Sequence, residues 1–209
     1  SGMKKLTTDA IAKIFAIANG EGGGITGVPT GFVKLDQLLS GLQPSDLVIM
    51  AARPSMGKTA FALSVARAAA RQGKSVGIFS LEMSAQQLVL RLISADAGVS
   101  LQALRSGRLS NAEMHEIVTR VDDLMNARIF IDDSAGLTPV EFRAKCRRMK
   151  IEHKIDLVMV DYLQLMHAPK AESREREISM ISHTLKAVAK ELDIPVVALS
   201  QLNRTLEAR

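Results

Sequence analysis

The feature that most constrains the chain is an apolar segment that runs directly into a glycine-containing loop. Residues 47–52 are all apolar and follow the turn-like Pro44-Ser-Asp46, which predicts a buried strand. The loop Arg53-Pro-Ser-Met-Gly-Lys-Thr59 comes next, and residues 60–66 have the composition of a helix. A strand, such a loop and a helix in this order form a P-loop, where backbone N–H groups and the positive helix end converge on a polyphosphate. The sequence therefore predicts a nucleotide-binding α/β protein.

Within the loop, two side chains are expected to carry most of the chemistry. Lys58 would reach the β- and γ-phosphates of a nucleotide, and the hydroxyl of Thr59 would bind Mg²⁺. The predicted nucleotide-binding residues are Arg53, Pro54, Ser55, Met56, Gly57, Lys58 and Thr59. Ala52 stands where the consensus has its first glycine, so an ordinary strand–helix turn is the alternative interpretation.

Composition and charge narrow the class of protein further. The 209 residues are 47% apolar, which suffices for one domain with a core, and no apolar run reaches the ~18 residues of a membrane span. The single cysteine excludes an internal disulfide and suits a reducing cytosol. A net charge of +5 permits a polyanionic partner. The chain has one Tyr, no Trp and six Phe that mostly lie inside apolar runs. It therefore offers almost no exposed aromatic faces for base stacking and would bind nucleic acid largely through phosphates.

Apolar strands and helices alternate along most of the chain. Strands are predicted at 47–52, 75–81, 128–132, 156–161 and 195–200, and helices at 58–71, 84–97 and 177–192, with further helix starts at Ser110 and Thr138. Near-continuous apolar strands separated by helices are typical of a mostly parallel, twisted sheet with helices on both faces. In such a sheet, ligands bind outside the carboxyl ends of the strands.

The N-terminal part of the chain is predicted to form a separate segment. Residues 5–18 have an amphipathic helical pattern, and residues 19–24 contain four glycines, which is typical of a flexible hinge. A short amphipathic helix on such a hinge has to bury its apolar face on its own domain or on a neighbouring subunit, and we favour the neighbour. The predicted organisation is a linker helix and hinge at 1–24, followed by one domain at 25–209.

Three further strands end in polar residues that suit nucleotide hydrolysis. Asp161 follows an apolar run and fits a Walker B carboxylate, which holds Mg²⁺ together with Thr59. Glu82 is suited to deprotonate an attacking water, and Gln201 could hydrogen-bond a γ-phosphate without titrating. The alternatives are a strand-end cap for Asp161, a favourable first-turn charge for Glu82 and a surface amide for Gln201.

Five motifs occur in order along the chain. They are Ile25–Asp36, Ala51–Thr59, Phe79–Ser84, Val160–Met166 and Leu199–Arg204. Together they resemble the RecA-like motor domain of the bacterial replicative DnaB helicases over residues 25–209. The resemblance implies a RecA-like P-loop NTPase with ATP and Mg²⁺ as cofactors. It also implies that Lys58 and Thr59 are the Walker A pair, Asp161 the Walker B residue, Glu82 the catalytic carboxylate and Gln201 the phosphate sensor.

The resemblance also implies how the protein acts. A homohexameric ring, in which residues 5–18 pack on the adjacent subunit, would hydrolyse ATP, move 5′ to 3′ on single-stranded DNA and unwind duplex at the bacterial replication fork. Lys170, Arg174 and Arg176 lie in a predicted loop where this family contacts DNA. Glutamates alternate with them, so a solvated, self-paired loop is the alternative. Localisation would be cytoplasmic, at the nucleoid.

Primase and a helicase loader are the further partners that the resemblance implies for full-length members of the family, with no membrane partner. The family's primase-contacting N-terminal domain and its arginine-finger segment have no counterpart in these residues, so we expect stronger nucleotide binding than hydrolysis. Two rival functions are another RecA-fold ATPase, of the strand-exchange or circadian type, and an ATP-binding ring scaffold without unwinding. The motifs Phe79–Ser84 and Ser200–Arg204 favour the helicase.

Overall fold

Parallel strands and helices alternate through the part of the chain that the computed structural model describes, residues 2–19, 25–166 and 173–202. The strands are β1 (Leu47–Ala52), β2 (Val76–Ser80), β3 (Ile129–Asp132), β4 (Leu157–Asp161) and β5 (Val196–Gln201). The helices are α1 (Met3–Ala18), α2 (Val33–Leu39), α3 (Lys58–Arg71), α4 (Ala85–Ala97), α5 (Leu101–Ser106), α6 (Asn111–Met125), α7 (Pro139–His153) and α8 (Arg174–Leu192), with a 3₁₀ turn η1 (Leu163–Leu165). None of these helices is long and apolar enough to cross a membrane.

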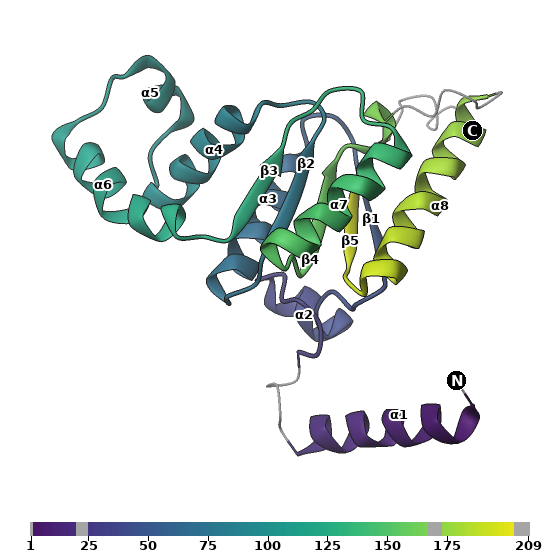
Figure 1. Cartoon of the computed structure of the whole chain (residues 1–209). Helices are drawn as coiled ribbons and strands as arrows, with labels where there is room; N and C mark the ends of the chain where they lie inside the picture. Colours follow the sequence, from purple (N-terminus) through teal and green to yellow (C-terminus); the bar gives the residue numbers. More distant parts are fainter. Residues whose placement is uncertain (1, 20–24, 167–172, 203–209) are drawn as a thin grey trace.

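The five strands form one sheet in the order β1-β5-β4-β2-β3, and every pair is parallel (Figure 1). β1 pairs with β5 along its whole length, ending with Ala52 opposite Gln201. β4 pairs with β5 over a shorter stretch that ends with Val160 opposite Ala198. Because parallel strands end at the same edge, the segments that follow β1, β2, β4 and β5 meet there. The predicted parallel α/β fold is confirmed.

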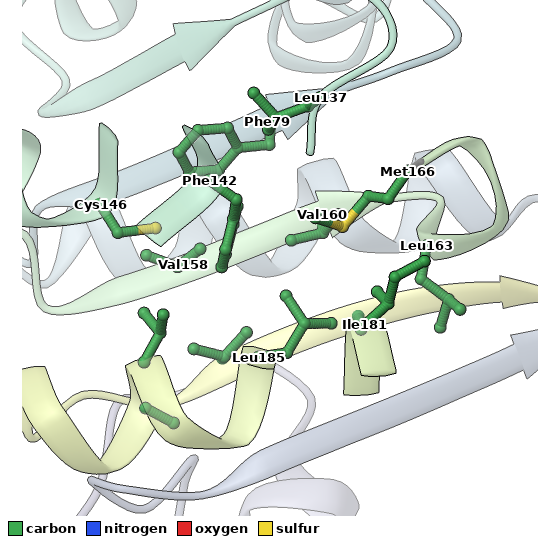
Figure 2. Close-up of a cluster of buried hydrophobic side chains, with 14 of the residues drawn as sticks. Phe79, Leu137, Phe142, Cys146, Val158, Val160, Leu163, Met166, Ile181 and Leu185 are labelled. Carbon is green, nitrogen blue, oxygen red and sulfur yellow. The ribbon is translucent and has the colours of Figure 1, made fainter. Parts of the chain in front are cut away.

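Helices cover both faces of the sheet (Figure 1). On one face, Phe142 of α7 and Ile181 and Leu185 of α8 pack in a buried cluster with residues of β2, β4 and β5 (Figure 2). The rings of Phe79 and Phe142 meet edge to face with their centroids 4.8 Å apart, an arrangement that aromatic quadrupoles favour. On the other face, apolar residues of α3 and α4 such as Leu63, Ala66, Ala69, Leu88 and Leu92 form a second cluster.

Cys146, the single cysteine, lies in the first cluster, on α7 (Figure 2). Burial raises the pKa of its thiol far above the ordinary range, and Asp132 adds to the effect. Since the thiolate is the reactive form, Cys146 is a packing residue.

Hydrogen bonds at the predicted caps explain where several helices begin. The hydroxyls of Ser110 and Thr138 accept hydrogen bonds from the third residue of α6 and α7. The carboxylates of Glu113 and Glu141 accept a hydrogen bond from the backbone N–H of the cap residue in each case. Because these reciprocal bonds satisfy backbone donors at the helix start, both predicted boundaries are confirmed.

Two short helices and the start of α8 were not predicted correctly. α2 has no side-chain cap, and α5 has only six residues, although Ser100 and Gly107 cap its two ends. α8 begins at Arg174 and not at 177, because the hydroxyl of Ser173 accepts a hydrogen bond from the backbone of Arg176 at 3.3 Å and caps the helix. Arg174 and Arg176 therefore lie in the first turn of α8, and the prediction that they belong to a loop is wrong.

α1 carries an exposed apolar face. Its larger apolar side chains are between 44% and 63% exposed at Leu6, Ile11, Ile14, Phe15 and Ile17. The predicted amphipathic helix is present, with its start two residues earlier than expected. Within the described residues, α1 buries none of these large side chains on its own domain.

Candidate nucleotide-binding site

A cavity of about 390 Å³ lies at the carboxyl edge of the sheet, between the loop after β1 and the ends of β2 and β5. Its walls include Glu82, Gln201 and every residue of the predicted nucleotide-binding loop except Met56. The side chain of Met56 is 72% exposed. Ligand pockets of this kind range from roughly 300 to 1,000 Å³, so the cavity is large enough for much of a nucleotide.

The backbone of the loop directs the start of α3 at this cavity. Gly57 caps α3 with a φ of 81°, a left-handed conformation that glycine adopts without steric strain. The buried residues Ala66 and Ala69 fix α3 against the sheet, so its free N–H groups face the position where phosphates would bind. Ala52 needs no special backbone conformation, since it is an ordinary strand residue paired with Gln201. Alanine can therefore replace the first consensus glycine.

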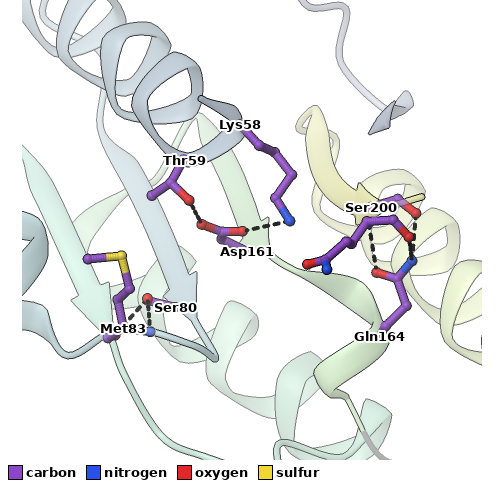
Figure 3. Close-up of polar contacts among 8 residues, drawn as sticks. Lys58, Thr59, Ser80, Met83, Asp161, Gln164 and Ser200 are labelled. Atoms are coloured by element: carbon purple, nitrogen blue, oxygen red, sulfur yellow. Dashed lines mark hydrogen bonds and ion pairs between the residues drawn. The ribbon is translucent and has the colours of Figure 1, made fainter. Parts of the chain in front are cut away.

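Lys58, Thr59 and Asp161 form a buried polar cluster beside the cavity (Figure 3). The hydroxyl of Thr59 donates to Oδ2 of Asp161 at 2.6 Å, and Nζ of Lys58 lies 3.5 Å from Oδ1. The side chains of Lys58 and Asp161 are only 10% and 7% exposed. The structure thus brings together three residues that the sequence predicted to share one site.

This cluster fits a Mg²⁺ site. Oδ1 of Asp161 is buried and makes no hydrogen bond among the described residues, so its one close partner there is the ammonium group of Lys58 at 3.5 Å. A carboxylate and a hydroxyl are the oxygen ligands that Mg²⁺ takes, directly or through water. No three His, Cys, Asp or Glu side chains gather in the described ranges in a way that could hold a metal. An ion at Asp161 would therefore depend on phosphate oxygens for its remaining ligands.

Tyr162 is a residue of the site that sequence reasoning missed. Nζ of Lys58 lies 4.0 Å from the centre of the Tyr162 ring, within the range of a cation–π contact. The ammonium group is therefore held between this ring and the carboxylate of Asp161. The signal was available, since Tyr162 directly follows Asp161 in the chain.

A tight turn after β2 carries Glu82. The hydroxyl of Ser80 donates to the carbonyl of Met83 at 2.7 Å and accepts from its N–H at 3.3 Å (Figure 3). α4 begins only after its N-cap, Ser84, so Glu82 lies outside the first helical turn. The geometry thus disfavours the alternative role as a first-turn charge, and Glu82 lines the cavity.

Arg91 is a second missed residue. It reaches the same cavity from α4, and its Nε is buried without a hydrogen-bond partner among the described residues. A buried cationic donor of this kind is suited to a phosphate oxygen. A basic residue between Leu88 and Leu92 on an otherwise apolar helix face was the signal that could have revealed it.

Two of the predicted DNA-binding residues, Arg174 and Arg176, are not among the residues that line the cavity. Lys170 falls outside the described residues. Arg174 forms an ion pair with Glu177 and donates a hydrogen bond to the carbonyl of Gln164. Hydrogen bonds from its own backbone N–H and from Ser173 lower the pKa of Glu175. The first turn of α8 therefore pairs part of its own charge, as the alternative interpretation supposed, and a DNA phosphate would have to compete with these contacts.

Residues 27–209 match the family described as the DnaB-like helicase C terminal domain. The replicative DNA helicase DnaB of Geobacillus stearothermophilus is 49% identical over 190 residues, or 90% of this chain and 42% of that protein. DnaB of Rhodothermus marinus is 51% identical over 99% of this chain and 22% of that protein. The chain thus spans less than half the length of these relatives.

Solved structures give the same result for the fold. A DnaB-like replicative helicase, described with its interactions with primase, superposes with a TM-score of 0.87 at 36% identity, covering 96% of this chain and 49% of that one. A second solved structure, of an ATPase domain, has a TM-score of 0.89 at 37% identity, covering 97% and 73%. The RadB recombinase, with a TM-score of 0.50 at 22% identity over 83% of this chain and 70% of that one, shares the fold alone. With the family match covering the whole of the nucleotide-binding loop and the strand ends around it, the chain belongs to the DnaB-like helicase C-terminal domain family.

Proposed function

We propose that the chain is the ATP-driven motor domain of a bacterial replicative DNA helicase. The observation that carries the proposal is the single cavity that joins the buried cluster of Lys58, Thr59 and Asp161 to Glu82 and Gln201. The identity of about half to replicative helicases over most of the chain supports it. The same identity favours a helicase over a strand-exchange or circadian ATPase, because both of these relatives are replicative DNA helicases.

The predicted site residues have distinct roles in this proposal. Lys58 and the N–H groups of the loop bind the phosphates of ATP, and Thr59 and Asp161 hold Mg²⁺. The bound ion neutralises charge on the phosphate oxygens. Glu82 accepts a proton from the attacking water, and Gln201 hydrogen-bonds the γ-phosphate. Such a site performs phosphoryl transfer to water by positioning and electrostatics.

Assembly and DNA contact complete the proposal. The exposed apolar face of α1 docks on a neighbouring subunit of a homohexamer, since solvent exposure of such a face is unfavourable. The ring moves 5′ to 3′ on single-stranded DNA, and Lys170, Arg174 and Arg176 contact its phosphates. In the longer protein, primase and a helicase loader bind the same assembly, which works in the bacterial cytoplasm at the replication fork. The interaction of a related DnaB-like helicase with primase supports primase as one of these partners.

The phosphate-binding role of Lys58 can be measured directly. Lys58→Ala removes the one loop side-chain ammonium aimed at the phosphates and is expected to weaken Mg·ATP binding at least about tenfold. Titration calorimetry of this chain measures the affinity, with Lys190→Ala, at the far end of α8, as the matched charge control. An affinity equal to that of the unaltered chain would contradict the assignment.

The catalytic role of Glu82 predicts a separation of binding from turnover. Glu82→Gln keeps the size of the side chain but removes the base, so ATP hydrolysis is expected to fall about 10²-fold or more while ATP affinity is retained. The turnover rate is measured as steady-state ATP hydrolysis by the full-length protein on single-stranded DNA. Glu116→Gln on α6 is the control. Equal losses of affinity and turnover would mark Glu82 as a structural residue.

Docking of α1 predicts a dependence of assembly on its apolar face. Changing Ile14 and Phe15 to Asp is expected to lower the oligomeric mass of the full-length protein in sedimentation while its circular dichroism stays native. Lys5→Asp, on the opposite side of α1 by helical spacing, serves as the control. Loss of folding in the monomer would show instead that α1 packs on its own domain.

Phosphate contact by α8 predicts a change in salt dependence. Each phosphate contact contributes about 0.7 to the log–log salt slope of single-strand binding. Neutralising Arg174 and Arg176 to Gln is therefore expected to reduce the slope by about 1.4 and to weaken binding equally for all base compositions. Fluorescence anisotropy at several salt concentrations measures the affinity for single-stranded DNA and hence the slope, with Arg120→Gln as the control. An unchanged slope would place the DNA path elsewhere.

A further inference from the structure

β5 loses one of its neighbours before it reaches the cavity. β4 pairs with β5 only as far as Val160 opposite Ala198, whereas β5 continues to Gln201 and stays paired with β1 on its other side. The described sheet therefore offers Gln201 no strand partner on the β4 side. Backbone N–H and C=O groups that lack a partner destabilise a buried or half-buried strand.

The side chain of Gln164 supplies the missing partner (Figure 3). Its Nε2 donates to the carbonyl of Gln201 at 3.0 Å, and its Oε1 accepts from the N–H of Gln201 at 3.2 Å. Nε2 also donates to the hydroxyl of Ser200 at 2.8 Å. A primary amide has the donors and the acceptor of a peptide group. Gln164 therefore takes the place of β4 at the one residue of β5 whose side chain lines the cavity.

The backbone of Gln164 has a different partner from its side chain, namely Arg174 at the start of α8. Its carbonyl accepts a hydrogen bond from the guanidinium group of Arg174, which also pairs with the carboxylate of Glu177. The side chain of Glu177 is only 12% exposed, whereas that of Arg174 is 45% exposed, so the carboxylate of this ion pair is shielded while the guanidinium group stays accessible to solvent. An uninterrupted path of hydrogen bonds and an ion pair therefore runs from the first turn of α8, through η1, to the end of β5.

We propose that Gln164 is a positioning residue that couples the DNA-contacting start of α8 to the γ-phosphate side of the nucleotide cavity. This inference rests on the proposed function, because it needs Arg174 to contact DNA and Gln201 to contact nucleotide. A DNA phosphate that attracts the guanidinium of Arg174 weakens its bond to the Gln164 carbonyl. The change shifts the amide that holds Gln201. By linkage, a nucleotide that fixes Gln201 changes the affinity for DNA by the same factor.

Gln164 itself does not line the cavity, and this makes the inference specific. A residue that acts only through Gln201 should affect ligands that carry a γ-phosphate and spare those that lack it. General loosening of the sheet would instead weaken ATP and ADP binding alike.

The test compares nucleotide affinities in the full-length protein, with and without saturating oligo-dT. In Gln164→Ala, the affinity for ATPγS is expected to fall about 3- to 10-fold, the scale of one or two net hydrogen bonds, while the affinity for ADP changes less than about 2-fold. The factor by which oligo-dT alters ATPγS affinity is expected to approach one. Gln102→Ala on the exposed surface of α5 is the control and should match the unaltered protein.

A second variant keeps the test valid if alanine impairs folding. Gln164→Glu has the same shape and keeps an acceptor for the N–H of Gln201, but it cannot donate to the Gln201 carbonyl. It is expected to lose the preference for ATPγS over ADP as well. Equal effects on ATPγS and ADP, or variants that behave like Gln102→Ala, would overturn the inference. An unaltered protein that binds no nucleotide or no DNA would overturn the proposed function itself, and that outcome is recognised without any variant.

Discussion

The buried carboxylate of Asp161 imposes the constraint on which the site depends. A charge in a nearly inaccessible position is very unfavourable without partners, and Thr59 and Lys58 are those partners. β5 lies between β1 and β4 in the sheet, so the loop after β1 has to pass the end of β5 before α3 can bring these two residues to β4. The loop after β1 and the start of α3 thus bring both partners of this carboxylate to the end of β4.

Much of the fold could be predicted because its strands are continuous apolar runs. Both ends of all five strands were predicted to within one residue, and α3 was bounded correctly because Gly57 and Gly73 mark its limits. α2 could not be predicted, since it has no side-chain cap and depends on tertiary contacts such as the buried Asp36, which accepts from Thr30. The early start of α8 was missed because its charged first turn resembles a loop when the cap at Ser173 is overlooked.

The residues of the candidate site also fall into a group that the sequence predicts and a group that it does not. Lys58, Thr59, Glu82, Asp161 and Gln201 all follow strands or end them, and the rule that ligands bind at the carboxyl ends of parallel strands was enough to group them. Tyr162, Arg91 and Gln164 were missed. Arg91 and Gln164 become neighbours of the site through helix packing and strand order, and of these two only Arg91 leaves a signal in the sequence. That order cannot be read from the chain, since the pairing of β4 with β5 joins segments separated by a whole helix.

The arrangement around Cys146 has a practical consequence. The only thiol of these 209 residues is sealed between α7 and the sheet, and burial keeps it protonated. A thiol reagent can therefore reach it only when α7 separates from the strands, so the rate of its modification reports how often this core opens. For the same reason, a cysteine placed on the surface of α1 or α8 could be labelled selectively while Cys146 remains in place. The slow reaction of Cys146 is then the internal reference against which the reaction of the added cysteine is compared.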